Sequence, residues 1–155
     1  KFAVDRRDEL AEHRDLIKHT IIDNAAAGFA LQGLEATEAE ERRTQLWHHV
    51  REFMEAHEFM VWPVNPVPPF PAEQETLMEV GGVKMATYVD WGALRHVISV
   101  VGLPSISVPV GFTRDGLPIG LQITGRHNQD FAVLQLAAAF ERETQYWRKR
   151  PSFEI

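Results

Sequence analysis

Residues 102–125 read GLPSISVPVGFTRDGLPIGLQITG, and this stretch decides the fold. On both sides of a central turn, branched apolar side chains alternate with small or polar ones, which is the period of a half-buried strand. The side chains that share the apolar face are Ile106, Val108, Val110, Ile119, Leu121 and Ile123. Asp115-Gly116 between them favours the positive φ of a tight connection. The stretch therefore predicts a β-hairpin at about residues 105–124.

The opposite face of this hairpin carries unusually small residues, among them Ser105, Ser107 and Gly120. Small residues on a strand let a helix or another backbone approach closely. Neither serine has a lysine or histidine near it in the sequence that could act as a base, and serines on a strand face are more often packing residues than nucleophiles. We interpret this face as a packing surface.

Two helices are predicted upstream of the hairpin. Apolar residues recur at helical spacing over about residues 5–32, and Gly33 offers a C-terminal stop. Thr37 and Glu40 have the spacing of a capping box, in which each side chain bonds a free backbone N–H. A long helix is therefore expected over about residues 37–58.

A strand and a proline-rich loop lie between the long helix and the hairpin. Residues 59–62 have strand composition, and five prolines fall within residues 63–71. Proline fixes φ and removes a backbone donor, so residues 63–71 are expected to form an extended loop. The apolar residues between the prolines favour a loop that packs against something. Further helices are predicted at about residues 88–101 and 131–144.

This order of elements indicates an α/β protein, with residues 1–155 as a single segment. The predicted strands are too few for a complete sheet, since two-stranded sheets are marginal by themselves. We expect the sheet edges to need neighbours, supplied by more of the same chain or by a self-association partner.

Composition excludes several classes of function. The 155 residues include 16 Lys and Arg against 22 Asp and Glu, a net charge of −6, and no cysteine. Without cysteine there is no disulfide framework, thiolate metal site or Cys nucleophile. The acidic balance argues against a nucleic-acid partner, and no apolar run approaches the roughly 20 residues of a membrane span. With no signal-peptide pattern, a cytoplasmic protein without a membrane partner is expected.

No catalytic group stands out from residue spacing. The seven histidines lack metal-site spacing, and neither a Gly-x-Ser-x-Gly elbow nor a glycine-rich phosphate loop occurs. The residues by themselves predict no metal, no cofactor and no self-sufficient catalytic site.

Two motifs nevertheless resemble a known family. Residues 102–112 read GLPSISVPVGF and residues 115–125 read DGLPIGLQITG, followed by a helix that ends in Phe140-Glu141. Together they resemble the C-terminal end of the amidase signature family. The long helix running into residues 59–63 is also similar to that family. The resemblance implies the C-terminal portion of an α/β/α sandwich with a mixed β-sheet, with the hairpin and its flanking helices as part of it.

The resemblance also implies an activity, but not one that this chain carries alone. Family members hydrolyse amides with a serine nucleophile, a second serine preceded by a cis peptide bond, and a lysine. Those residues lie in a Gly/Ser-rich region upstream of the part matched here, so no catalytic residue is assigned. The chain also begins at Lys1, and not at methionine. We therefore expect a C-terminal fragment of an amidase that is inactive alone.

In such a parent enzyme the substrate is a small-molecule amide, and this segment is expected to form part of the substrate pocket. The loop after Trp62 and the helix around Trp91 are the expected contributors. The candidate pocket residues are Trp62, Asn65, Phe70, Trp91 and His96. Ordinary packing or surface exposure is an equally good interpretation of each.

Two alternatives remain open from sequence. A non-catalytic binding or scaffold module could keep the same fold. The amidase component of a tRNA-dependent amidotransferase shares the same motifs, although the acidic charge gives no support for tRNA contact by this segment.

Overall fold

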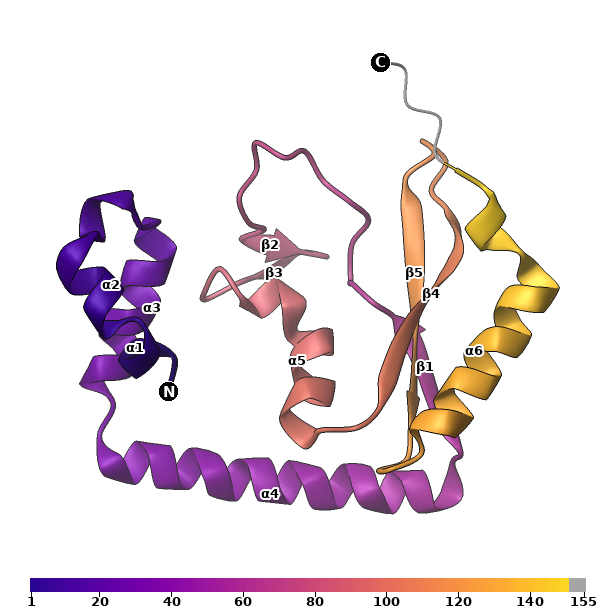
Figure 1. The fold of residues 1–155 in the computed structure, drawn as a ribbon, viewed down its shortest axis with the longest axis horizontal. Coiled ribbons are helices and arrows are strands. Elements are labelled where there is room, and N and C mark those ends of the chain that lie inside the picture. The colour runs from indigo at the N-terminus through magenta and orange to yellow at the C-terminus, as the bar shows by residue number, and fades with distance from the viewer. Residues whose placement is uncertain (151–155) are drawn as a thin grey trace. The chain divides into compact units, whose positions relative to one another are not determined.

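A computed structural model describes residues 1–150, and the chain divides into two compact units after Gln45. Figure 1 shows the elements of both units with their labels. The first unit is helical, and the second contains the predicted hairpin. That residues 1–155 are a single segment of one domain stays a prediction.

The first unit contains short helices where the sequence predicted one helix over residues 5–32. Its elements are α1 (Phe2–Asp5), α2 (Arg7–Glu12), η1 (Arg14–Leu16), α3 (His19–Ala30) and the beginning of α4 (Gly33–Ala56). The backbone is extended at Ile17 and Lys18, which separates α3 from the preceding turns. This break lets α1 fold back on α3, where a Cβ on Gly28 would lie 2.8 Å from Ala3 Cβ. A continuous helix could not make that contact.

Helix α4 begins at Gly33, four residues before the predicted Thr37. The Thr37 hydroxyl donates to the Gly33 carbonyl at 3.0 Å, a bond within the helix and not a cap. The Glu35 carboxylate instead accepts the Gln32 backbone N–H at 2.7 Å. Gly33, which the sequence predicted as the end of the preceding helix, is thus the first residue of α4. The Glu35 carboxylate stabilises this helix start because it accepts a backbone N–H that has no partner inside the helix.

The second unit is built on a three-stranded antiparallel sheet. Its strands are β1 (Phe59–Pro63), β4 (Ser105–Phe112) and β5 (Pro118–Gly125), in the order β1-β5-β4. The predicted hairpin is confirmed, with Ile106 opposite Ile123 and Ser107 opposite Gln122, and a bulge between Pro109 and Gly111. The α/β class is confirmed as well. Strands β1 and β4 are the sheet edges within the residues that the structure describes.

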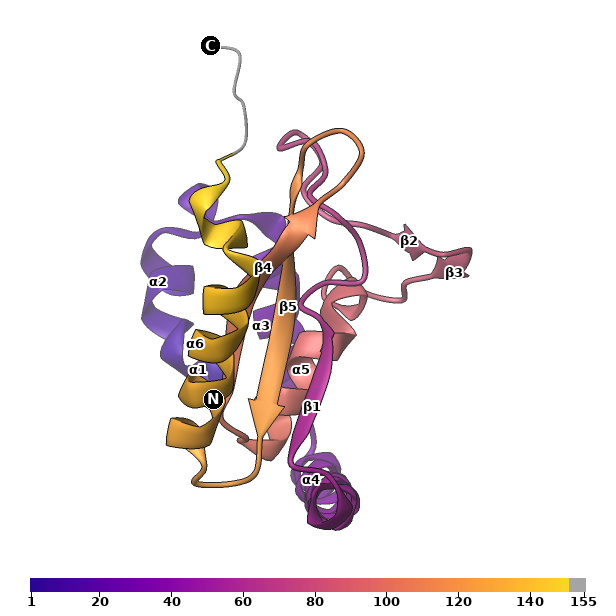
Figure 2. The same ribbon diagram turned by 90° about the vertical axis from the view of Figure 1, so that its right-hand side faces the viewer.

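The apolar face of the sheet packs against helix α6 (Asp130–Thr144). The buried core between them comprises Val108, Ile123, Val133 and Ala137. Figures 1 and 2 show α6 running along this side of the strands, whereas α5 lies on the other side. The alternating sequence of β4 and β5 therefore produces two different faces, as predicted. One set of side chains points to α6 and the other points away from it.

Helix α5 (Ala93–Val101), which follows the 3₁₀ turn η2 (Asp90–Gly92), lies on the side of the small-residue face, where Ser105 and Ser107 stay exposed. The sequence predicted one helix over residues 88–101. In the structure the α-helix begins only at Ala93, and the turn before it is held by hydrogen bonds to Asp90. Gly102 ends α5 in the left-handed conformation, with φ of 69°. A small hairpin of β2 (Glu79–Val80) and β3 (Val83–Lys84), joined by Gly81-Gly82, lies away from the main sheet in Figure 2. The last element, η3 (Tyr146–Arg148), follows α6.

Candidate functional site

Three of the five predicted pocket residues come together in one cavity. The proline-rich loop has no helix or strand between Pro63 and Glu79, and it lies against η2 and the start of β5. There it encloses about 340 Å³, which we call the aromatic cavity. Its walls are Val64, Asn65, Val67, Pro68, Pro69, Phe70, Trp91, Pro118, Ile119 and Gly120. The interleaved apolar residues of the loop therefore form an apolar cavity wall together with Trp91.

Two aromatic rings shape this cavity. Phe70 and Trp91 meet edge to face, with their centroids 5.6 Å apart and their planes at 80°. This arrangement is the favoured one for two aromatic side chains. Such a wall suits a flat or branched apolar group, since small-molecule sites are mostly apolar with a few polar groups that fix orientation.

Asn65 provides a polar group in the aromatic cavity. Its Oδ1 is buried and has no hydrogen-bond partner among residues 1–150. An unpaired buried carbonyl oxygen is costly, because it has lost its water without gaining a donor. Oδ1 can accept a hydrogen bond from an N–H group of a bound molecule.

The turn that carries Trp91 is held by Thr87 and Asp90. The Thr87 hydroxyl donates to Asp90 Oδ1 at 2.6 Å, and its backbone N–H donates to Asp90 Oδ2 at 2.8 Å. These two bonds, the hydroxyl bond first, hold the pKa of the Asp90 carboxyl below its ordinary value. The carboxylate form of Asp90 is thus part of what positions Trp91.

Trp62 and His96, also predicted as pocket residues, lie elsewhere. The Trp62 indole N–H donates to Gln122 Oε1 at 3.1 Å, across the β1–β5 pair. Gln122 Nε2 in turn donates to Ser105 Oγ at 2.8 Å, and Ser105 Oγ is 2.9 Å from Thr124 Oγ1. Trp62 is therefore tied into a hydrogen-bonded network on the sheet. His96 is exposed on α5 and does not line the aromatic cavity.

A second cavity adjoins the aromatic one on the same face of the sheet. This polar cavity, of about 370 Å³, is lined by Val64, Arg95, Ile98, Ser99, Gly102, Leu103, Ser105, Ile106, Ser107 and Gln122. Val64 lines both cavities. The Arg95 guanidinium carbon lies 4.6 Å from the centroid of the Trp91 ring, so Arg95 stands where the two cavities meet.

Sequence reasoning did not name Arg95 among the residues expected to line a cavity. One signal was available: Arg95 lies four residues after Trp91. Residues four apart on a helix are neighbours, and an arginine stacks well on an aromatic face. The contribution of Gln122 and Ser107 could also have been found, since both lie on the small-residue face that the alternation identified.

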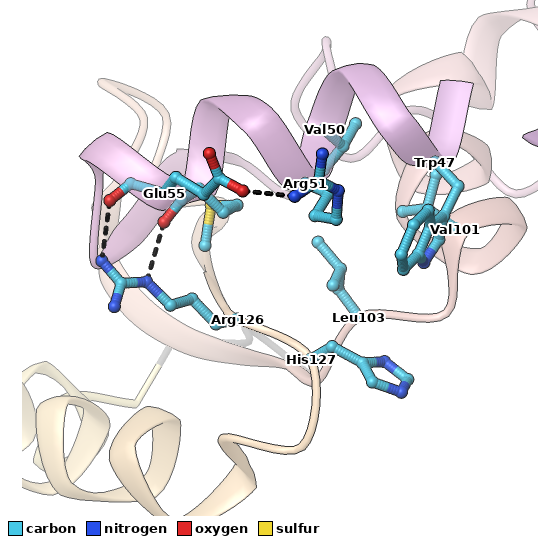
Figure 3. A pocket seen from close by; sticks show the side chains of 9 residues that line it. Trp47, Val50, Arg51, Glu55, Val101, Leu103, Arg126 and His127 are labelled. Carbon is cyan, nitrogen blue, oxygen red and sulfur yellow. Dashed lines mark hydrogen bonds and ion pairs between the residues drawn. The ribbon is translucent and has the colours of Figure 1, made fainter. Parts of the chain in front are cut away.

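A third cavity lies where the end of α4 meets the turn after β5. It has about 340 Å³ and is lined by Trp47, Val50, Arg51, Met54, Glu55, Val101, Leu103, Arg126 and His127 (Figure 3). Arg51 pairs with Glu55 along the helix. Arg126 Nε donates to the Met54 carbonyl at 2.8 Å and Arg126 Nη2 to the Glu55 carbonyl at 3.5 Å. These bonds satisfy carbonyls at the C-terminal end of α4, so the charged groups here serve the fold.

The hydroxyl of Ser105 has no base beside it. Besides Gln122 and Thr124, it donates to the Ile123 carbonyl at 3.2 Å. Within residues 1–150, no three His, Cys, Asp or Glu side chains gather as a metal site requires. No helix in the same residues is both long and apolar enough to cross a membrane.

The fold and these motifs define an amidase-signature protein. A sequence profile of the Amidase family matches residues 10–134, and the chain belongs to that family. It is 32% identical to an acylamidase of Rhodococcus erythropolis over 123 residues, which are 79% of this chain and 26% of the relative. It is also 32% identical to a glutamyl-tRNA(Gln) amidotransferase subunit of Oceanobacillus iheyensis, over 73% of this chain and 22% of that relative.

Solved structures agree on the fold. The crystal structure of an amidase superposes with a TM-score of 0.81 at 24% identity, covering 91% of this chain and 32% of the amidase. The structure of 6-aminohexanoate cyclic dimer hydrolase gives a TM-score of 0.82 at 20% identity, covering 97% of this chain and 34% of the hydrolase. The chain spans about a quarter of the length of the curated relatives it matches.

Proposed function

We propose that these residues form the C-terminal part of an amidase-signature hydrolase, which cleaves carboxylic amide C–N bonds by acyl transfer to a serine. In this proposal the chain completes the sheet, supplies part of the substrate pocket and does not hydrolyse amides alone. The observation that carries it is the aromatic cavity, which gathers Asn65, Phe70 and Trp91 beside the family's hairpin motif. The predicted cytoplasmic location rests on the sequence and belongs to the same proposal.

The chemistry of the proposal follows from what the cavity offers. Phe70 and Trp91 bury an apolar group of the amide, and burial of such a group contributes roughly 25 cal/mol for each Å² removed from water. Asn65 Oδ1 accepts an N–H and so fixes the orientation of that group. The sequence has no Gly/Ser-rich run to supply a nucleophile, so the chain binds and positions but does not attack.

The test is a pair of measurements on the purified chain with acetanilide, an apolar aryl amide. We expect saturable binding, followed through the indole N–H signal of Trp91 by NMR, and no release of aniline above background. Phe70→Ala removes one wall of the aromatic cavity and is expected to weaken binding at least fivefold, about 1 kcal/mol. Phe131→Ala is the matched control, because Phe131 is 73% exposed on α6.

Two results would contradict the proposal. Aniline release that disappears when a serine of the chain is mutated would show that the chain is an enzyme by itself. Equal binding by the Phe70→Ala and Phe131→Ala proteins would remove the aromatic cavity from the pocket.

The sheet edges bear on partners. Strand β1 pairs only with β5, and so does β4, within the part of the chain that the structure describes. Unpaired edge strands bind further strands readily. We propose that more of the parent chain, or a second copy of this one, pairs there.

A second candidate is the amidase component of a tRNA-dependent amidotransferase. It is favoured by relatives of that kind at 33% identity over 73% of the chain. The solved glutamyl-tRNA(Gln) amidotransferase subunit of Thermotoga maritima superposes with a TM-score of 0.57, below the 0.81 of the amidase. A non-catalytic scaffold module with this fold is the remaining alternative. A sharp melting transition of a stable monomer, without amide binding, would favour the module.

A further inference from the structure

Two buried polar side-chain atoms lack a hydrogen-bond partner within residues 1–150, and both belong to the adjoining cavities described above. They are Asn65 Oδ1, in a wall of the aromatic cavity, and Arg95 Nε, in a wall of the polar cavity. Trp91 links them, since it lines the aromatic cavity and stacks on the Arg95 guanidinium. One atom is an acceptor and the other a donor.

The surroundings of Arg95 favour an anion. The polar residues that share its cavity are hydroxyls and an amide, from Ser99, Ser105, Ser107 and Gln122, and no Asp or Glu lines it. Arg95 makes no ion pair within the described residues, although Arg6, Arg42, Arg43, Arg51 and Arg142 all do. An arginine in a cavity without an acid is suited to a carboxylate, whose two oxygens match the guanidinium fork.

The surroundings of Asn65 favour an amide N–H joined to an apolar group. Its carbonyl oxygen needs a donor, and the walls beside it are Phe70, Trp91 and prolines. An amide with an aryl group on its carbonyl carbon would place the ring among these walls while its N–H meets Oδ1.

We propose that the two cavities bind one class of ligand, an amide that carries a carboxylate, as N-aroyl amino acids do. The aryl group occupies the aromatic cavity, the amide N–H donates to Asn65 Oδ1, and the carboxylate pairs with Arg95. This inference rests on the proposed function, whose amide pocket it narrows to acidic amides.

The test compares three ligands that differ by one feature. N-benzoylglycine has the ring, the N–H and the carboxylate, N-benzoylglycinamide lacks the charge, and N-benzoyl-N-methylglycine lacks the N–H. Binding to the purified chain is followed by NMR through the Trp91 indole and Arg95 Nε–H signals. We expect N-benzoylglycine to bind about tenfold more tightly than either of the others. Each of the others loses one hydrogen bond, either the charge-assisted bond to Arg95 or the bond that pairs the buried Asn65 Oδ1.

Variants assign each preference to its residue. Arg95→Met keeps the unbranched stem and removes the charge, so the charged and neutral ligands should bind within twofold of each other, whereas Arg95→Lys should keep part of the preference. Arg114→Met is the matched control, because Arg114 is exposed in the β4–β5 turn and has the same charge. Asn65→Leu should erase the preference for the N–H. The Trp62 indole signal, which reports the sheet network, shows that each variant is folded.

The outcomes separate this inference from the proposed function. Equal binding of the charged and neutral amides to the unaltered chain overturns the inference but leaves the amide pocket intact. The same loss in Arg114→Met as in Arg95→Met also overturns it, because net charge would then explain the preference. If none of the three amides shifts the Trp91 signal, both the inference and the proposed pocket fail.

Discussion

Asp90 and Thr87 stabilise the turn that places Trp91 in the wall of the aromatic cavity. The two hydrogen bonds from Thr87 favour the ionised carboxyl and lower its pKa in the folded chain. A group with a lowered folded pKa contributes its stabilisation above its unfolded pKa, about 3.9 for Asp, and loses it as pH falls through the folded value. The Trp91 turn is therefore expected to stay formed at neutral pH and to loosen in acid.

The prediction concerns the midpoint of an acid titration. The Trp91 indole signal should move with a midpoint below about 3.9 in the unaltered chain. Thr87→Val removes the hydroxyl bond and should raise that midpoint toward the ordinary value. Thr113→Val is the control, since its hydroxyl accepts a backbone N–H from Leu117 and contacts no carboxylate. An identical midpoint in the Thr87→Val chain would contradict this account of the turn.

Residue-scale reasoning from sequence named three residues that line the aromatic cavity, Asn65, Phe70 and Trp91, and their role in binding stays a prediction. The proline-rich composition correctly indicated an extended loop, and Asn65 and Phe70 fell on it. Trp62 lies outside the aromatic cavity, because its indole bonds Gln122 across the β1–β5 pair, sixty residues away in the sequence, and no local pattern predicts that pairing. The unpaired state of Arg95 Nε and Asn65 Oδ1 was also beyond prediction, since it depends on which groups the tertiary fold brings near.

At the scale of elements, Arg126 joins the turn after β5 to the end of α4. Its guanidinium donates to the carbonyls of Met54, Glu55 and His57, the last at 3.3 Å, and Figure 3 shows Arg126 beside Glu55. The last carbonyls of a helix have no partner inside the helix. Arg126 therefore fixes where α4 ends and where β1 begins.

Arg126→Met should lower the free energy of unfolding by about 1–3 kcal/mol, because it leaves the partly buried Met54 carbonyl without its charged donor. Arg142→Met on α6 is the matched control and should change it by less than about 0.5 kcal/mol, since Arg142 is 75% exposed. Urea unfolding measures both. Equal effects of the two substitutions would show that Arg126 contributes no more than a surface charge.

The elements that sequence predicted best are those set by local pattern. The hairpin follows from alternation and an Asp-Gly turn, both within two dozen residues. Two predicted helix boundaries differ from the structure, the continuous helix over residues 5–32 and the start at Thr37. In each case a contact that the local pattern does not contain decides the boundary. The first is interrupted so that Ala3 packs on Gly28, and the second begins early because Glu35 bonds the Gln32 N–H.

At the scale of the molecule, the chain is similar to about a third of a solved amidase, and it belongs to the amidase family. Two adjoining cavities lie on the α5 side of the sheet. The α6 side, by contrast, is closed by a core of Val108, Ile123, Val133 and Ala137. One face of the sheet thus provides stability, and we assign ligand binding to the other.

The central claim, that an amide binds in the aromatic cavity, is tested most directly by intermolecular NOEs from the ring of bound acetanilide. We predict NOEs to the rings of Phe70 and Trp91, which meet in that cavity. NOEs to Trp47 and Val101 instead would place the ligand in the third cavity and contradict the claim.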